Sequence, residues 1–176
     1  MPTAGLCFPH LKLRRVHEEK STEDEDDSEQ PVDLQRLVQA GLALQKKHLR
    51  ILAIDETTVS RRDMERVIGE AGHTVVAVCS AAEGLQELRK AQVDEAYGKK
   101  DQFFDLIVLG HLYHGMSVAK AIQKIRSQGR PCAVLGVANE ATTEEAQFQI
   151  AGVDGIMTKP LTAAKLKKAI VGEWMR

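Results

Sequence analysis

The residues best suited to chemistry follow short apolar runs. Asp55 and Glu56 come directly after ILAI, and adjacent carboxylates repel each other unless a cation or a proton intervenes. A divalent-metal site is one interpretation of this pair. Lys159 and Pro160 follow GIMT, and the compact charge of a lysine suits a phosphate group. Asn139 follows a third run, AVLGVA.

A fourth run, DLIVLGHLYHGM, ends without a reactive side chain, because Gly110 stands where one is expected. His111 and His114 follow it with H-x-x-H spacing, and imidazole with carboxylate suits zinc or similar ions. One alternative is therefore a metal site, or a metal-dependent enzyme, built from Asp55, Glu56, His111 and His114. A weaker alternative is a phosphohistidine at His111 or His114. By default both are histidines of a surface loop.

The elements that must position these residues alternate regularly from residue 49 onward. Apolar runs on both faces, joined by helices, predict a doubly wound α/β domain with a parallel sheet. In such folds ligands bind at the carboxyl ends of the strands. The predicted strands are residues 49–54, 74–78, 105–109, 133–137 and 155–157, and the predicted helices are about 60–71, 82–96, 117–128, 142–151 and 162–175.

The composition limits the class of partner and the compartment. With 24 basic and 25 acidic residues the formal charge is −1, which disfavours direct binding to nucleic acid or to an anionic membrane. Cys79 and Cys132 are expected to pack as reduced thiols at strand ends. No apolar run approaches the ~18–20 residues of a membrane span. We expect a cytoplasmic protein, or a nuclear one in a eukaryote.

The N-terminal part differs from the rest. Residues 22–29, TEDEDDSE, include six acids and no base. We predict that residues 1–30 form a disordered acidic tail, because such a run cannot bury enough surface to offset its ordering entropy. Residues 31–48 are predicted to be an amphipathic helix or a linker. Residues 49–176 form the predicted domain.

Three segments of that domain carry a resemblance to a known family. The segments ILAIDETTVSRR, DLIVLGHLYHGMS and AVLGVANEATTEEAQFQIAGVDGIMTKPLTAAKLKKAI resemble the receiver domains of two-component response regulators, above all the single-domain chemotaxis type. The resemblance covers about residues 49–174. It implies a flavodoxin-like (βα)5 sheet of order 2-1-3-4-5. It also implies that a histidine kinase or phosphotransfer protein donates phosphate to an aspartate at the end of the third strand.

Carried over residue by residue, the resemblance assigns a magnesium and phosphate site. Asp55 and Glu56 match the acidic pair, the backbone carbonyl of Leu112 matches a magnesium ligand, and Lys159 matches the phosphate-binding lysine. Gly110 takes the place of the phosphate-accepting aspartate, and glycine can supply neither a nucleophile nor a metal ligand. We therefore expect no required cofactor and at most weak binding of Mg²⁺. Lys159, with no phosphate to hold, is expected to pair with Asp55.

The sequence also departs from the family pattern at the residues that respond to the phosphate. Val137 takes the place of the hydroxyl residue that bonds the acyl phosphate, and Ile156 takes the place of the aromatic switch residue. His114 replaces a loop proline, and Val118 replaces the small residue at the start of the third helix. The sequence is therefore interpreted as a pseudo-receiver with no catalytic residue.

These expectations define a function. We expect a phosphorylation-independent signalling module that acts by protein–protein contacts in a two-component pathway and is not an enzyme. Its partners would be a histidine kinase, a phosphotransfer protein or a downstream effector. The output surface would comprise residues 142–151, 155–157 and 162–175. An alternative is a docking decoy that engages a kinase or phosphotransfer domain through residues 61–68. The sequence leaves the oligomeric state open.

Overall fold

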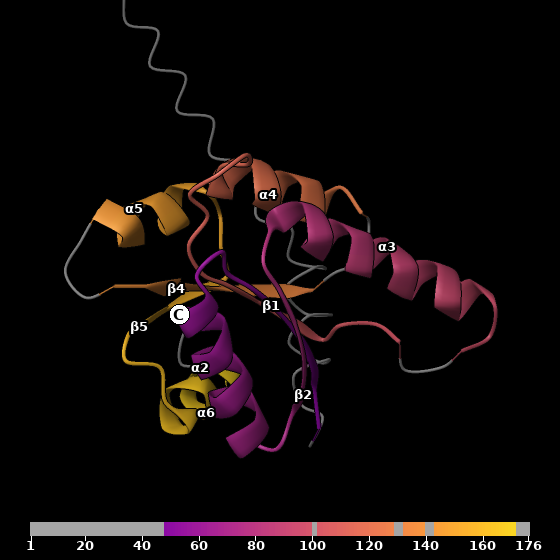
Figure 1. Cartoon of the computed structure of the whole chain (residues 1–176), viewed down its shortest axis with the longest axis horizontal. Helices are drawn as coiled ribbons and strands as arrows, with labels where there is room; N and C mark the ends of the chain where they lie inside the picture. Colours follow the sequence, from indigo (N-terminus) through magenta and orange to yellow (C-terminus); the bar gives the residue numbers. More distant parts are fainter. Residues whose placement is uncertain (1–47, 100–101, 129–131, 140–142, 172–176) are drawn as a thin grey trace, which may run out of the picture. The chain divides into compact units, whose positions relative to one another are not determined.

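A five-stranded parallel sheet forms the centre of the domain. The computed structural model describes residues 48–99, 102–128, 132–139 and 143–171, so the predicted tail 1–30 and nearly all of segment 31–48 lie outside the described residues. The strand order β2-β1-β3-β4-β5 confirms the predicted fold class (Figure 1). The strands are β1 (Arg50–Ile54), β2 (Thr74–Val78), β3 (Leu106–Leu109), β4 (Ala133–Ala138) and β5 (Gly155–Thr158).

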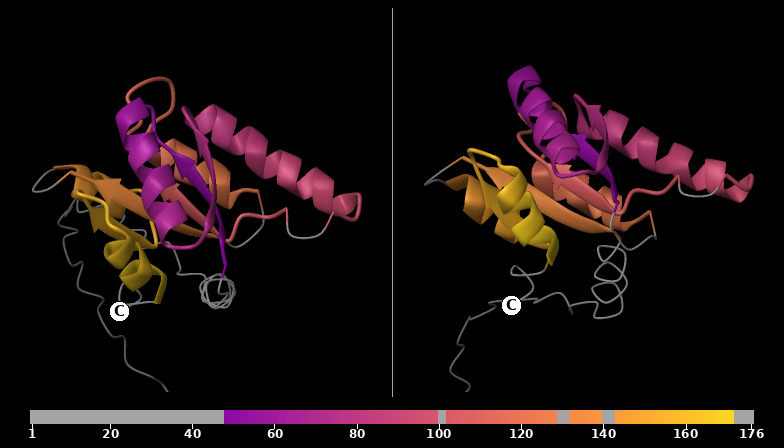
Figure 2. Two further views of the ribbon diagram at one scale, coloured as in Figure 1. Left: turned by 60° about the horizontal axis from the view of Figure 1, so that its bottom comes forward. Right: turned by 90° about the horizontal axis from the view of Figure 1, so that it is seen from below.

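Helices cover both faces of this sheet (Figures 1 and 2). Two of them, α2 (Thr58–Glu70) and α6 (Ala163–Val171), pack on one face. The other face carries α3 (Ala81–Ala96), α4 (Val118–Arg126) and α5 (Thr143–Ile150). The helix and strand ends that can be compared lie within two residues of the sequence prediction, and several coincide with it. None of the helices described is long and apolar enough to cross a membrane.

Side chains alternate between two apolar clusters along each strand. In β1, Ile51 and Ala53 face α2 and α6, whereas Leu52 and Ile54 face the opposite layer. All four are buried. Burial on both faces is why the strands read as continuous apolar runs without a polar alternation.

One glycine lets a helix approach the sheet closely. A Cβ atom at Gly136 of β4 would lie 2.7 Å from the ring of Phe148 in α5. Phe148 is buried, so its ring has little room to retreat. The absence of a side chain at position 136 therefore allows α5 to pack against β4.

The strand register places the first and third strands' ends side by side. Ile54 pairs with Leu109, and the N–H of Gly110 donates to the carbonyl of Ile54 at 2.8 Å. The residues that follow these strands, Asp55 and Gly110, are therefore neighbours across the strand pair. This register brings Asp55 and Glu56 next to Gly110, the position without a side chain.

Candidate functional site

Asp55 is fully buried at the end of β1. Its Oδ1 accepts a hydrogen bond from the N–H of Thr57 at 2.7 Å, and its Oδ2 accepts one from the N–H of His111 at 3.1 Å. The first bond closes a local turn into α2, and the second ties β1 to the loop after β3. The carboxylate is thus held by backbone donors on both of its oxygens.

Gly110 leaves the space that this carboxylate fills. A Cβ atom built at position 110 would lie 2.0 Å from Asp55 Oδ2 and 2.8 Å from the Cε atom of Met64 in α2. Both separations are far inside van der Waals contact. No side chain fits at position 110 unless Asp55 moves.

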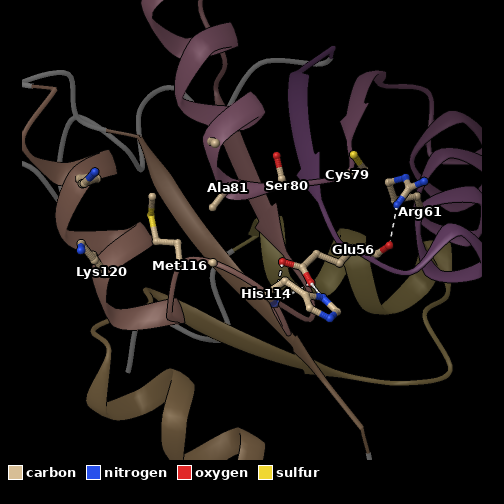
Figure 3. Close-up of a pocket in the computed structure, with 11 residues that line it drawn as sticks. Glu56, Arg61, Cys79, Ser80, Ala81, His114, Met116 and Lys120 are labelled. Atoms are coloured by element: carbon tan, nitrogen blue, oxygen red, sulfur yellow. Dashed lines mark hydrogen bonds and ion pairs between the residues drawn. The ribbon is translucent and has the colours of Figure 1, made fainter.

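Glu56 is bound to the β3–α4 loop, as Figure 3 shows. Its Oε2 accepts from the N–H groups of Tyr113 at 2.8 Å and His114 at 2.9 Å, and it lies 2.9 Å from Nδ1 of His114. Burial raises the pKa of the Glu56 carboxyl, but the hydrogen bonds from His114 and Tyr113 outweigh it and hold the pKa below its usual 4.5. Glu56 therefore anchors this loop as an anion.

Lys159 reaches a different partner from the predicted one. Its Nζ donates to Ser60 Oγ of α2 at 2.9 Å, and in the part of the chain that the structure describes no ion pair joins it to Asp55. The peptide bond between Lys159 and Pro160 is cis. The prediction that Lys159 pairs with Asp55 is therefore wrong: the ammonium group is held by the Ser60 hydroxyl, and the Asp55 carboxylate is held by backbone N–H groups.

His111 is buried and belongs to a second polar cluster. Its Nε2 lies 2.6 Å from Oε1 of Glu144 in α5, and the ring of Tyr113 stacks on it with centroids 5.4 Å apart. Glu144 Oε2 also accepts from the N–H of Asn139 at 2.8 Å. Burial raises the pKa of the Glu144 carboxyl, but the bonds from Asn139 and His111 outweigh it and lower the pKa. This cluster joins the end of β3 to α5.

The predicted metal site of Asp55, Glu56, His111 and His114 does not assemble. His114 contacts Glu56, whereas His111 contacts Glu144. Over the described residues, no three His, Cys, Asp or Glu side chains are grouped so that they could hold a metal ion. The prediction of a four-residue metal centre is wrong, because the two imidazoles contact two different carboxylates, Glu56 and Glu144.

The vestigial magnesium site fits the ion poorly. Mg²⁺ needs an octahedral shell of oxygen ligands and is usually bound by carboxylates. Here the four carboxylate oxygens of Asp55 and Glu56 all accept hydrogen bonds from backbone N–H groups, and Gly110 contributes no carboxylate. Leu112, whose carbonyl was the third candidate ligand, packs its side chain against the apolar cluster on the α3, α4 and α5 face.

The two predicted switch positions are apolar. Val137 is buried among the residues that face α2 and α6, and β4 continues for one residue to Ala138. Neither of these two strand-end residues has a hydroxyl group. Ile156 of β5 is partly buried against the opposite cluster. The side chains of Val137 and Ile156 therefore make apolar packing contacts.

Sequence reasoning missed the role of Arg61 in the site. Its Nη1 donates to the backbone carbonyls of Asp55 and Glu56, both at 2.9 Å, and its Nη2 donates to Thr58 Oγ1 at 3.1 Å. Arg61 thus fixes the loop that carries the acidic pair. The sequence does show a basic residue one helical turn into α2. Its partners are backbone carbonyls, which every residue has, so the sequence alone could not identify them.

Cys79 also departs from expectation. It is exposed, whereas Cys132 is buried as predicted. The Cys79 thiol donates to Glu83 at 3.3 Å, and this hydrogen bond raises the pKa of the thiol. A raised pKa leaves little thiolate at neutral pH, so the exposed thiol is poorly reactive.

Comparison with known proteins shows likeness in structure only. The sequence matches no protein-family model and no curated protein. Its structure is similar to chemotaxis protein CheY4 of Vibrio cholerae, with 21% identity, a TM-score of 0.56, and coverage of 70% of this chain and 96% of that one. The chain has the receiver fold.

Two further solved structures extend this likeness. A response regulator receiver domain from Clostridium thermocellum gives 20% identity and a TM-score of 0.54, covering 72% of this chain and 94% of that chain. The receiver domain of sensor histidine kinase PA1611 from Pseudomonas aeruginosa gives 19% identity and a TM-score of 0.57. The match covers 73% of this chain and 98% of that chain. That receiver domain has magnesium coordinated in its active site cleft.

Proposed function

We propose that this chain is a receiver-like module that signals by protein–protein contacts and does not accept phosphate. The observation that carries the proposal is the occupation of the acceptor's space by Asp55, whose Oδ2 lies 2.0 Å from the place of a Cβ at position 110. Acyl phosphate formation needs a carboxylate oxygen that can attack phosphorus. Gly110 has none.

The neighbouring carboxylates are poor substitutes for that acceptor. Asp55 is fully buried with both oxygens hydrogen-bonded. The Glu56 side chain is 12% exposed and bound to two N–H groups and an imidazole. Attack by either residue would require breaking these bonds first. The site therefore works as a structural clamp between β1 and β3.

A candidate contact surface lies at the β5 edge of the sheet. It comprises α5, β5 and α6, because β5 is the last strand of the order and these two helices flank it on opposite faces. Ile150 of α5 and Val171 of α6 are 86% and 85% exposed. With Ile156 packed in place of an aromatic residue, no phosphate-driven population shift is needed to present this surface. Binding would be constitutive and would take place in the cytoplasm or nucleus.

A second candidate is a decoy that docks through α2. Val59, in the first turn of α2, is 70% exposed, and Arg62 beside it is exposed too. An apolar residue beside a cation suits a partner helix with an apolar stripe and acidic flanks. Partners of either surface would be histidine kinases, phosphotransfer proteins or downstream effectors. Mg²⁺ would not be required for either.

Intact mass after incubation with acetyl phosphate and Mg²⁺ tests the proposal. A phosphorylatable receiver domain run in parallel should gain a phosphoryl adduct, and this chain should gain none. Affinity for purified histidine-kinase and phosphotransfer domains should be equal with and without acetyl phosphate. A hydroxylamine-labile adduct on this chain would overturn the proposal, because that lability marks an acyl phosphate.

A further inference from the structure

A pocket of about 690 Å³ opens beside the acidic pair, on the side of α3 and α4 (Figure 3). Its walls come from the loops that follow β1, β2 and β3, and from α4. In a sheet of order 2-1-3-4-5 the order in which strands are added reverses between β1 and β3, although all strands are parallel, and this switch point is where open α/β sheets bind ligands. The volume falls in the usual range for small-molecule sites, roughly 300–1,000 Å³.

The charges in this pocket are mostly positive. Lys120 and Lys124 line it from one face of α4, one turn apart, and Arg61 lines it from α2. Neither lysine Nζ forms an ion pair or hydrogen bond within the described ranges. Two like charges at this spacing weaken a helix slightly, and an anion between them would relieve that repulsion. Glu56 is the carboxylate of the lining and is already bound by His114.

Part of the remaining lining is apolar, and Cys79 and Ser80 also line the pocket. Ala81 and Ala82 of the first turn of α3 line the pocket together with Met116 of the β3–α4 loop. A methionine thioether adapts to rings and irregular apolar groups, and two alanines leave space above the helix backbone. The pocket thus has one cationic wall and one small apolar wall.

We infer that this pocket binds a small organic diphosphate, with its phosphates between Lys120 and Lys124 and its organic group against Ala81, Ala82 and Met116. Lysine is a compact cation suited to phosphate oxygens, and two lysines match two adjacent phosphate charges. The inference is independent of the proposed signalling role, because it uses no residue of the α5–β5–α6 surface. A bound ligand would bridge the loops after β2 and β3 and the helix α4.

Calorimetric titration of the full chain with inorganic pyrophosphate and with ADP, in EDTA and low salt, tests the inference. Pyrophosphate probes the cationic wall alone, and ADP probes both walls. Both should bind saturably, and ADP should bind more tightly. The Lys120→Ala/Lys124→Ala double variant should weaken both ligands at least about tenfold, which is about 1.4 kcal/mol.

Two further variants separate the pocket from general charge effects. Arg62→Ala/Lys167→Ala removes the same charge from exposed positions outside the pocket and should leave both affinities unchanged. Ala82→Trp fills the pocket without changing charge and should weaken ADP much more than pyrophosphate. The absence of saturable pyrophosphate binding, or equal losses in the two double variants, would overturn the inference. So would ADP binding no tighter than pyrophosphate.

Discussion

The Asp55 carboxylate lies where a side chain at position 110 would have to be, with Oδ2 2.0 Å from the place of the Gly110 Cβ. Asp55 and Gly110 therefore form a complementary pair: one residue is held in place because the other has no side chain. The pair explains how a receiver fold can keep its acidic residue buried without a metal ion. Each oxygen of the Asp55 carboxylate accepts a hydrogen bond from a backbone N–H group instead of binding a metal ion.

Gly110→Ala should lower the free energy of unfolding by about 1–3 kcal/mol, because one methyl group overpacks the site. Gly69→Ala is the matched control. A Cβ at Gly69 meets nothing within 4 Å, and alanine favours the helix, so this variant should gain about 0.5–1 kcal/mol. Urea unfolding measures both changes. Equal effects of the two substitutions would show that position 110 is not crowded.

A double-mutant cycle tests whether Asp55 is the source of that crowding. Asp55→Ala should destabilise by itself, since the N–H groups of Thr57 and His111 lose their acceptor. Combined with Gly110→Ala, it should cost about 1–2 kcal/mol less than the sum of the two single changes. Chemical denaturation of the four proteins gives this coupling energy. Strict additivity would place the clash elsewhere, for example on Met64.

Glu144→Gln should destabilise the domain in a pH-dependent way. A carboxyl whose pKa is lowered by folding contributes stability above its unfolded value, near 4.5, and loses it as the pH falls through the folded pKa. The variant should therefore be about 1–2 kcal/mol less stable than the parent at pH 6, and this difference should shrink as the pH falls below 4.5. Thermal or urea unfolding of both proteins over a series of pH values from 6 downward checks this. A difference in stability that did not change with pH would rule out the carboxylate charge as the cause.

The buried ion pair of Arg126 and Asp154 should matter more than an exposed one. Arg126 Nη2 lies 2.7 Å from Asp154 Oδ2, the Asp154 side chain is 4% exposed, and its Oδ2 also accepts from the N–H of Val134. Asp154→Ala should cost about 3 kcal/mol, since it leaves the partly buried Arg126 cation without its carboxylate partner and removes the acceptor of the Val134 N–H.

Glu70→Gln is the comparison for this substitution, because its pair with Arg66 is more than half exposed on both sides. It should cost less than about 1 kcal/mol, since surface ion pairs gain little over hydration. Unfolding midpoints of the two variants give the contrast. Comparable losses would show that burial does not set the strength of these pairs.

The fold could be predicted because its signals are local. Continuous apolar runs such as residues 106–109 mark strands, and the glycines at positions 72 and 152 mark helix ends. Both glycines have positive φ angles in the structure. Segment order then limits the topology, since parallel strands need right-handed crossovers. The proximity of Asp55 to Gly110 followed from that topology.

The chemistry of the site depended on contacts that no local pattern encodes. By default both histidines were expected in a surface loop, with a shared metal site as an alternative, yet His111 is buried and meets Glu144, whereas His114 meets Glu56. Lys159 was expected to pair with a carboxylate and instead bonds to the Ser60 hydroxyl. Backbone N–H groups compete for the same acceptors, and their positions depend on the folded loops.

The sequence by itself determined the doubly wound receiver fold and the absence of a side chain at Gly110, because hydrophobic period and residue type are properties of the chain. Only the tertiary structure decided what fills the vacant space. Asp55 can sit there because the register of β1 and β3 brings the N–H of His111 within reach of its carboxylate, and the local turn into α2 adds the N–H of Thr57. The same register opens the pocket between α3 and α4, where residues from three loops meet.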